Sequence, residues 1–107
     1  MNNQSKILIP LDHSPQSMAA YKYAKVIAAH TGCDLVLLYV VEEPGFFTKS
    51  KLKKEQQAEI ANEAKNSLQK IIDEDAELRD KSLNATSMVK QGKVYKKIIE
   101  ATEELKP

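Results

Sequence analysis

The sequence is poor in residues that mark several protein classes: its 107 positions include one cysteine, three glycines and no tryptophan. A single cysteine excludes an internal disulfide and favours a cytoplasmic location. No apolar run approaches the roughly 20 residues that a membrane helix needs, and the N-terminus lacks the apolar stretch of a signal peptide. We therefore expect a cytoplasmic protein with no membrane partner.

An excess of charge of either sign is also missing. Sixteen Lys and Arg face 15 Asp and Glu, which gives a formal net charge of +1. Because so small a charge creates no global field, we expect no nucleic-acid partner. His13, His30 and Cys33 lack the spacing of metal ligands, so no metal site is predicted. The length suits one domain, 1–107.

What the sequence does contain is three alternations of an apolar run and a helical pattern. Alternation of this kind predicts an α/β fold, with a parallel sheet and right-handed βαβ crossovers. The third run is the least apolar, which places it at a sheet edge. The predicted strands are about 6–12, 34–41 and 84–89, and the predicted helices are about 15–30, 53–74 and 94–105.

Helical spacing predicts which face of each helix is buried. The stretch 73–81 is charged and is expected to be a solvated helix end and loop. Phe46 and Phe47 lie in a segment without a firm period, and they either cover a site, join a dimer contact or pack locally. The inward residues are expected to be Ala20, Ala24, Ile27 and Ala28, then Ile60, Ala61, Ala64, Leu68, Ile71 and Ile72, and finally Val94, Ile98, Ile99, Thr102 and Leu105.

The junction between the first strand and the first helix predicts a small-molecule site. The run Ile7–Ile9 is followed by Asp12, and Ser14 and Pro15 have the order of an N-cap and a first helical residue. Ligands of open α/β sheets bind at the carboxyl ends of strands, beside helix N-termini. Asp12 either contacts such a ligand or only forms the turn, whereas Ser14 is expected to be a structural cap.

His13 lies in the same loop and invites a catalytic interpretation. Nucleophilic catalysis needs a serine or cysteine, a base and a group that orients the base. No such set can be identified around His13 from the sequence. We therefore predict no catalytic residue and no enzymatic activity.

Together these segments resemble the universal stress protein family. Residues 7–14, ILIPLDHS, are similar to the opening ILVPVDGS pattern of that family, and residues 32–41 and 89–101 are similar to its second strand and third crossover. The resemblance implies a Rossmann-like fold with a five-stranded sheet in the order 3-2-1-4-5. It also implies an ATP site at the switch point between strands one and four.

The same resemblance implies the residues of that site. Pro10, Leu11 and Asp12 would line the nucleoside, with Asp12 near the ribose or the metal–phosphate region. The backbone of Val40 would contact adenine. ATP, alone or with Mg²⁺, is the implied cofactor, and a homodimer is the expected assembly.

The chain departs from the family pattern after its third helix. The glycines stand at positions 32, 45 and 92, and none belongs to a glycine-rich phosphate loop. We expect only the first three βα units, without strands four and five and the last helix, and hence impaired nucleotide binding. Since an order 3-2-1 leaves strand one at an open edge, the chain would be a fragment or be completed by a partner. The alternative function is a non-nucleotide dimerisation or interaction module of the same fold.

Overall fold

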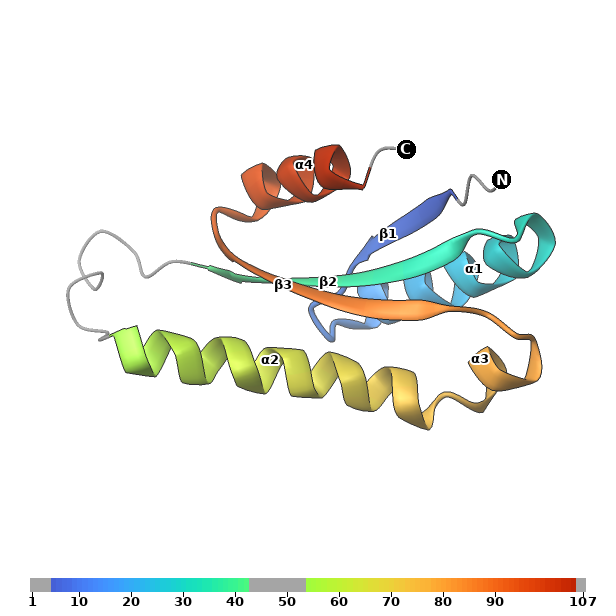
Figure 1. Cartoon of the computed structure of the whole chain (residues 1–107), viewed down its shortest axis with the longest axis horizontal. Coiled ribbons are helices and arrows are strands. Elements are labelled where there is room, and N and C mark those ends of the chain that lie inside the picture. Colours follow the sequence, from blue (N-terminus) through green and yellow to red (C-terminus); the bar gives the residue numbers. More distant parts are fainter. Residues whose placement is uncertain (1–4, 43–53, 106–107) are drawn as a thin grey trace.

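A three-stranded parallel sheet forms the centre of the molecule (Figure 1). The computed structural model describes residues 5–42 and 54–105. The strands β1 (Lys6–Pro10), β2 (Asp34–Glu42) and β3 (Ala85–Gly92) lie in the order β1-β2-β3. The predicted α/β class, the parallel sheet and the edge position of the third strand are therefore confirmed.

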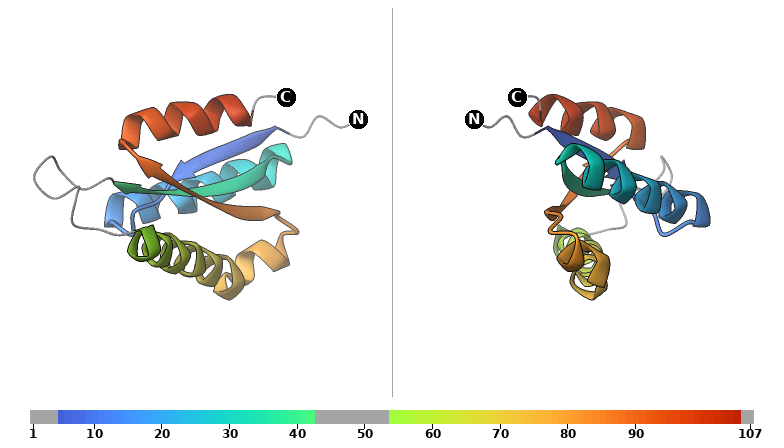
Figure 2. Two further views of the ribbon diagram at one scale, coloured as in Figure 1. Left: turned by 60° about the vertical axis from the view of Figure 1, so that its left-hand side comes forward. Right: turned by 90° about the vertical axis from the view of Figure 1, so that its right-hand side faces the viewer.

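Helices cover both faces of this sheet. They are α1 (Pro15–Thr31), α2 (Lys54–Glu74), α3 (Ala76–Asp80) and α4 (Val94–Glu104). Figures 1 and 2 show α4 on one face and α2 with α3 on the other. The helix α1 shares the α2 face, because its buried residues belong to the same core cluster as those of α2 and α3. The helices that connect successive parallel strands, α1 and α2, thus lie on one face of the sheet. Two consecutive right-handed crossovers in the same direction require this arrangement.

The strand β2 is buried on both faces. Leu35 and Leu37 are fully buried in the core shared with α1 and α2, while Val36 and Leu38 are buried on the face that α4 covers. Alternate residues of a strand point to opposite faces. The continuous apolar run from residue 35 to 41 is thereby explained.

Local hydrogen bonds cap both ends of α1, and the N-cap is the predicted Ser14. Ser14 is the N-cap, and its hydroxyl accepts a hydrogen bond of 3.1 Å from the Ser17 N–H. At the other end, Gly32 has a φ of 79° and donates its N–H to the Ala28 carbonyl at 2.8 Å. A side chain is disfavoured at such a φ, so glycine is suited to end the helix.

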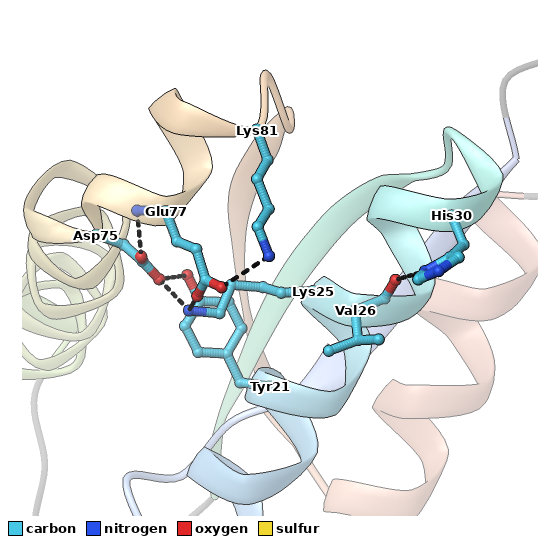
Figure 3. A network of polar contacts seen from close by, with 7 residues as sticks. All are labelled: Tyr21, Lys25, Val26, His30, Asp75, Glu77 and Lys81. Carbon is cyan, nitrogen blue, oxygen red and sulfur yellow. Dashed lines mark hydrogen bonds and ion pairs between the residues drawn. The ribbon is translucent and has the colours of Figure 1, made fainter.

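The buried face of α1 differs from the predicted one. Ala24 and Ala28 are buried as expected, but Ala20 and Ile27 are exposed. Tyr21 and Lys25 are buried in their place, at 2% and 7% exposure. The reason is a set of polar contacts to residues about 50 positions away, drawn in Figure 3 and called here the Lys25 cluster: Tyr21, Lys25, Asp75 and Glu77.

The Lys25 cluster joins α1 to the junction of α2 and α3. Asp75 accepts a bond of 2.7 Å from the Tyr21 hydroxyl and another of 2.7 Å from Lys25 Nζ, which also lies 2.8 Å from Glu77. Asp75 is the N-cap of α3, since it accepts from the Glu77 N–H at 3.0 Å. The helix end predicted within 73–81 is confirmed, since α2 ends at Glu74, but the predicted loop is wrong, because this cap and the buried Leu78 support a short helix.

Other boundaries and faces are corrected as well. On α4, Ala101 is buried, whereas Ile99 is 59% exposed and Thr102 is exposed; Ile60 of α2 is 38% exposed. β1 ends at residue 10 rather than 12, and β3 runs through residue 92 rather than 89 because it stays paired with β2 to that point. The segment with Phe46 and Phe47 lies outside the described residues.

Candidate functional site

A pocket of about 530 Å³ opens at the carboxyl ends of β1 and β2. This volume lies in the range of small-molecule sites. The pocket occurs because β1 ends at Pro10, opposite Leu38, while β2 continues to Glu42. Its lining comes from β1, the following loop, α1, β2 and α4: Pro10, Leu11, Asp12, Ser14, Gln16, Ser17, Leu38, Tyr39, Val40 and Val94.

Asp12 supplies the carboxylate of the pocket. Its Oδ1 accepts a hydrogen bond of 3.0 Å from the Ser14 N–H, and its own N–H donates to the Ser17 hydroxyl at 3.3 Å. Hydrogen bonding by Ser14, through side chain and backbone, and by Ser17 lowers the pKa of Asp12 to about 2. Asp12 thus forms the turn before α1 and, as an exposed carboxylate, also offers acceptor oxygens to a ligand.

Val40 brings a peptide group to the same pocket. The Leu11 N–H donates to the Leu38 carbonyl at 2.7 Å, so the peptide groups of Leu38 face β1. In a parallel ladder, peptide groups two residues apart face the same neighbour. Those of Val40 therefore face the β1 side at a level where β1 has already ended. A donor and an acceptor are left beside an apolar wall of Pro10 and Val94.

The structure places all four sequence-predicted site residues in this one pocket. Pro10 and Asp12 are exposed at its rim, and Leu11, at 1% exposure, forms part of its floor, with Val40 on the β2 side. Their role in binding a nucleotide stays a prediction. Val94 also lines the pocket but is not among the predicted site residues. It is the first residue of α4, the helix that follows β3, and a helix that follows a parallel strand begins near the carboxyl end of the sheet.

The hydroxyl groups near the start of α1 are engaged in local bonds. The Ser14 hydroxyl accepts from the Ser17 N–H, and the Ser17 hydroxyl donates to the Ser14 carbonyl at 3.0 Å. A phosphate would have to compete with these capping bonds. Among residues 5–42 and 54–105, no cluster of three side chains suited to a metal ion is found.

His13 turns to α2 and pairs with a hydroxyl. Its Nε2 lies 3.2 Å from the Ser67 hydroxyl, and its ring centroid is 6.1 Å from that of Tyr39. The backbone of His13 has a φ of 67°, which lies in the left-handed region that few residues other than glycine adopt. The described part of the chain gives its Nδ1 no carboxylate partner to orient the ring. The absence of enzymatic activity remains a prediction.

Within the described residues, no helix has the length and apolarity that crossing a bilayer requires. The cytoplasmic location and the absence of a nucleic-acid partner stay predictions.

Comparison with known proteins gives a family and a fold. The model of the universal stress protein family matches residues 4–107. No curated protein matches the sequence significantly.

Three solved structures have the same fold. Universal stress protein UspA from Lactobacillus plantarum is 23% identical, with a TM-score of 0.73, and the match covers 96% of this chain and 72% of that one. The protein MJ0577, described as a hypothetical protein given a structure-based assignment of biochemical function, is 25% identical, with a TM-score of 0.74 and coverages of 94% and 67%. A family protein from Burkholderia pseudomallei is 22% identical, with a TM-score of 0.64 and coverages of 94% and 74%.

Proposed function

Because this chain belongs to the universal stress protein family, we propose that it is a stress-response or signalling domain whose pocket binds the nucleoside part of an adenine nucleotide. One observation carries the proposal: the Val40 peptide group and the Asp12 carboxylate line one partly apolar pocket. Adenine presents an amino donor beside ring acceptors. A backbone N–H and C=O pair suits that edge, and a carboxylate suits the ribose hydroxyls.

The phosphates contribute little in this proposal. The α1 hydroxyls are used for capping, and the glycines at 32, 45 and 92 form no phosphate loop. We expect a dissociation constant of about 0.1–1 mM for adenosine, or roughly 4–5.5 kcal/mol of binding free energy. ATP should bind no more than about threefold more tightly, with or without Mg²⁺.

A calorimetric or NMR titration with adenosine, ATP and guanosine tests this proposal. Val94→Trp places a large ring at the pocket wall and should weaken adenosine binding at least about tenfold. Tyr95→Trp is the matched control, since Tyr95 is the next residue on α4, is 61% exposed and does not line the pocket. Micromolar affinity for ATP would contradict the weak phosphate contribution, and equal affinities of the two variants would exclude this pocket.

A second function, a dimerisation or interaction module, is favoured by a separate observation. Among the described residues, β1 pairs with β2 only, so its other edge is open. Open strand edges are templates for pairing with another chain. Sedimentation equilibrium would support this function if the chain forms a homodimer, and a monomer at every concentration would oppose it.

A further inference from the structure

Another pocket, of about 470 Å³, opens at the amino end of β3, and it is called here the Arg79 pocket. It lies between the end of α2, the short helix α3 and the start of β3 (Figure 1). Because the strands are parallel, this is the end of the sheet opposite the pocket of Asp12 and Val40. The two pockets share no lining residue, so the Arg79 pocket is a separate cavity.

Part of the lining of the Arg79 pocket is apolar. Leu78 is buried, and Ile72, Leu83 and Ala85 are half-buried at the border of the core. The Leu83 N–H donates to the Leu78 carbonyl at 2.8 Å, which fixes the turn between α3 and β3. This turn therefore holds an apolar surface against which a small aliphatic side chain can be buried.

Arg79 is the only arginine of the chain, and it lines this pocket. Its Nη1 donates to the Asp73 carbonyl at 3.0 Å, in the last turn of α2, where carbonyl groups lack helical partners. This bond holds the guanidinium in place but uses only one of its five N–H donors. Among residues 5–42 and 54–105, no carboxylate pairs with Arg79, whereas Lys25 and Lys90 each contact two. Arg79 is thus suited to bind the carboxylate of a ligand.

Asp73 brings a negative charge to the same pocket. It is exposed, and its Oδ1 accepts a hydrogen bond of 2.9 Å from Gln69, one turn earlier on α2. A ligand with only a negative charge would be repelled by Asp73, and one with only a positive charge would be repelled by Arg79. A ligand that carries both charges can pair with each residue.

We propose that the Arg79 pocket binds a free α-amino acid with an apolar side chain, such as leucine. The carboxylate of the amino acid pairs with Arg79 and its ammonium group with Asp73, while its side chain lies against Ile72 and Leu83. An α-ammonium and an α-carboxylate occur together only on a free amino acid, since each end of a peptide has one of them. The inference goes beyond the proposed function and depends neither on nucleotide binding nor on dimerisation.

The affinity should be low, because the two charged residues are exposed. Asp73 and Arg79 both remain in contact with water, and exposed ion pairs contribute little to binding. For a ligand as small as leucine, we expect a dissociation constant of about 1–10 mM. Such an affinity is measurable by NMR titration of the full chain.

A titration with leucine and three analogues forms the first arm of the test. The backbone amide shifts of Leu83 and Ala85 should saturate, whereas that of Val40, at the other end of the sheet, should not change. Leucinamide lacks the carboxylate, N-acetyl-leucine lacks the ammonium group and glycine lacks the apolar side chain. Each should bind at least about threefold more weakly than leucine.

Two charge variants form the second arm. Arg79→Gln should weaken leucine binding at least about threefold. Lys81→Gln is the matched control, because it removes the same charge from an exposed residue two positions away that does not line the pocket. Its effect should be less than about 1.5-fold, since exposed charges outside a site are screened.

Asp73→Asn separates a loss of pairing from a loss of folding. It leaves the backbone carbonyl that Arg79 contacts. The variant should bind leucine more weakly than the wild type does but N-acetyl-leucine more tightly, because the repulsion of a lone carboxylate is removed. An unfolded pocket would lose both ligands.

Three results would overturn the proposal. Amide shifts of Leu83 and Ala85 that do not saturate by about 100 mM leucine would refute the site. Equal effects of Arg79→Gln and Lys81→Gln would show that binding does not use the guanidinium of the pocket. If N-acetyl-leucine or leucinamide binds as tightly as leucine, the ligand is the corresponding end of a peptide and not a free amino acid.

Discussion

Removing the charge of Lys25 should destabilise the fold by an amount that its contacts set. Lys25 Nζ lies 2.7 Å from Asp75 and 2.8 Å from Glu77. The side chains of Lys25 and Asp75 are only 9% and 14% exposed, whereas that of Glu77 is 43% exposed. Lys25→Met keeps most of the side-chain volume and the apolar stem, so the variant isolates the loss of the charge.

The two contacts contribute unequally. The bond to Glu77 is half exposed and contributes at most about 1 kcal/mol. The bond to Asp75 is a largely buried charged hydrogen bond, for which about 2 kcal/mol is typical. Asp75 keeps the Tyr21 hydroxyl and the Glu77 N–H as donors, so the loss stays below the 3–5 kcal/mol of a fully unpaired buried charge. We expect a total loss of about 2–3 kcal/mol.

Urea unfolding followed by circular dichroism at pH 7 measures this loss. A loss of 2–3 kcal/mol corresponds to a fall in Tm of about 10–20 °C for a domain of this size. Lys22→Met is the matched control, because Lys22 is an exposed lysine one turn earlier on α1. If Lys25→Met costs no more than Lys22→Met, the Lys25 cluster does not stabilise the fold.

Lys25→Met should also change how the free energy of unfolding depends on pH. Burial raises the pKa of Asp75, but hydrogen bonds from Lys25 and Tyr21 outweigh it and hold the pKa below the ordinary 3.8. The hydrogen bond from Lys25 likewise lowers the pKa of Glu77 below 4.5. A carboxyl with a lowered folded pKa stabilises above its unfolded pKa, and this stability is lost as pH falls through the folded value. The difference between wild type and Lys25→Met should therefore shrink below about pH 4, and a constant difference from pH 7 to pH 2 would refute the assignment.

Three further substitutions test the fold. Ser14→Ala removes the hydroxyl that accepts from the Ser17 N–H and should cost about 1 kcal/mol in urea unfolding. Leu68→Ala empties a fully buried position and should cost about 2–5 kcal/mol, measured in the same way. Gly92→Ala should cost about 1–2 kcal/mol in the same assay, because Gly92 has a φ of 138°. The added Cβ would lie 2.6 Å from Lys97 Cε, and removing that side chain with Lys97→Ala should recover little of the cost; full recovery would assign the cost to crowding.

The elements that sequence predicts best are those with local causes. The β2 run is apolar at every position from Leu35 to Val41, and the structure covers both its faces. Ser14 and Gly32 mark the two ends of α1 through hydrogen bonds to residues three or four positions away. Such signals need no knowledge of the tertiary structure.

The wrongly predicted buried residues are those whose surroundings are set by segments far away in the sequence. Lys25 is buried because Asp75, 50 positions away, bonds to it, and periodicity cannot contain that information. Ile27 and Ile99 were expected in the core because they are apolar, yet they are 38% and 59% exposed. An apolar residue at a helical spacing predicts burial only where another element covers it.

The pocket likewise has one cause that is local in the sequence and one that depends on the tertiary structure. The end of β1 is a local event, because the chain turns at Asp12 through its bond with the Ser14 N–H. The overhang of β2 depends on register, because only the pairing of Pro10 with Leu38 leaves the Val40 peptide beyond the end of β1. A register shift of one residue would turn that peptide toward β3. Asp12 could thus be derived from its own segment, whereas Val40 required the resemblance or the structure.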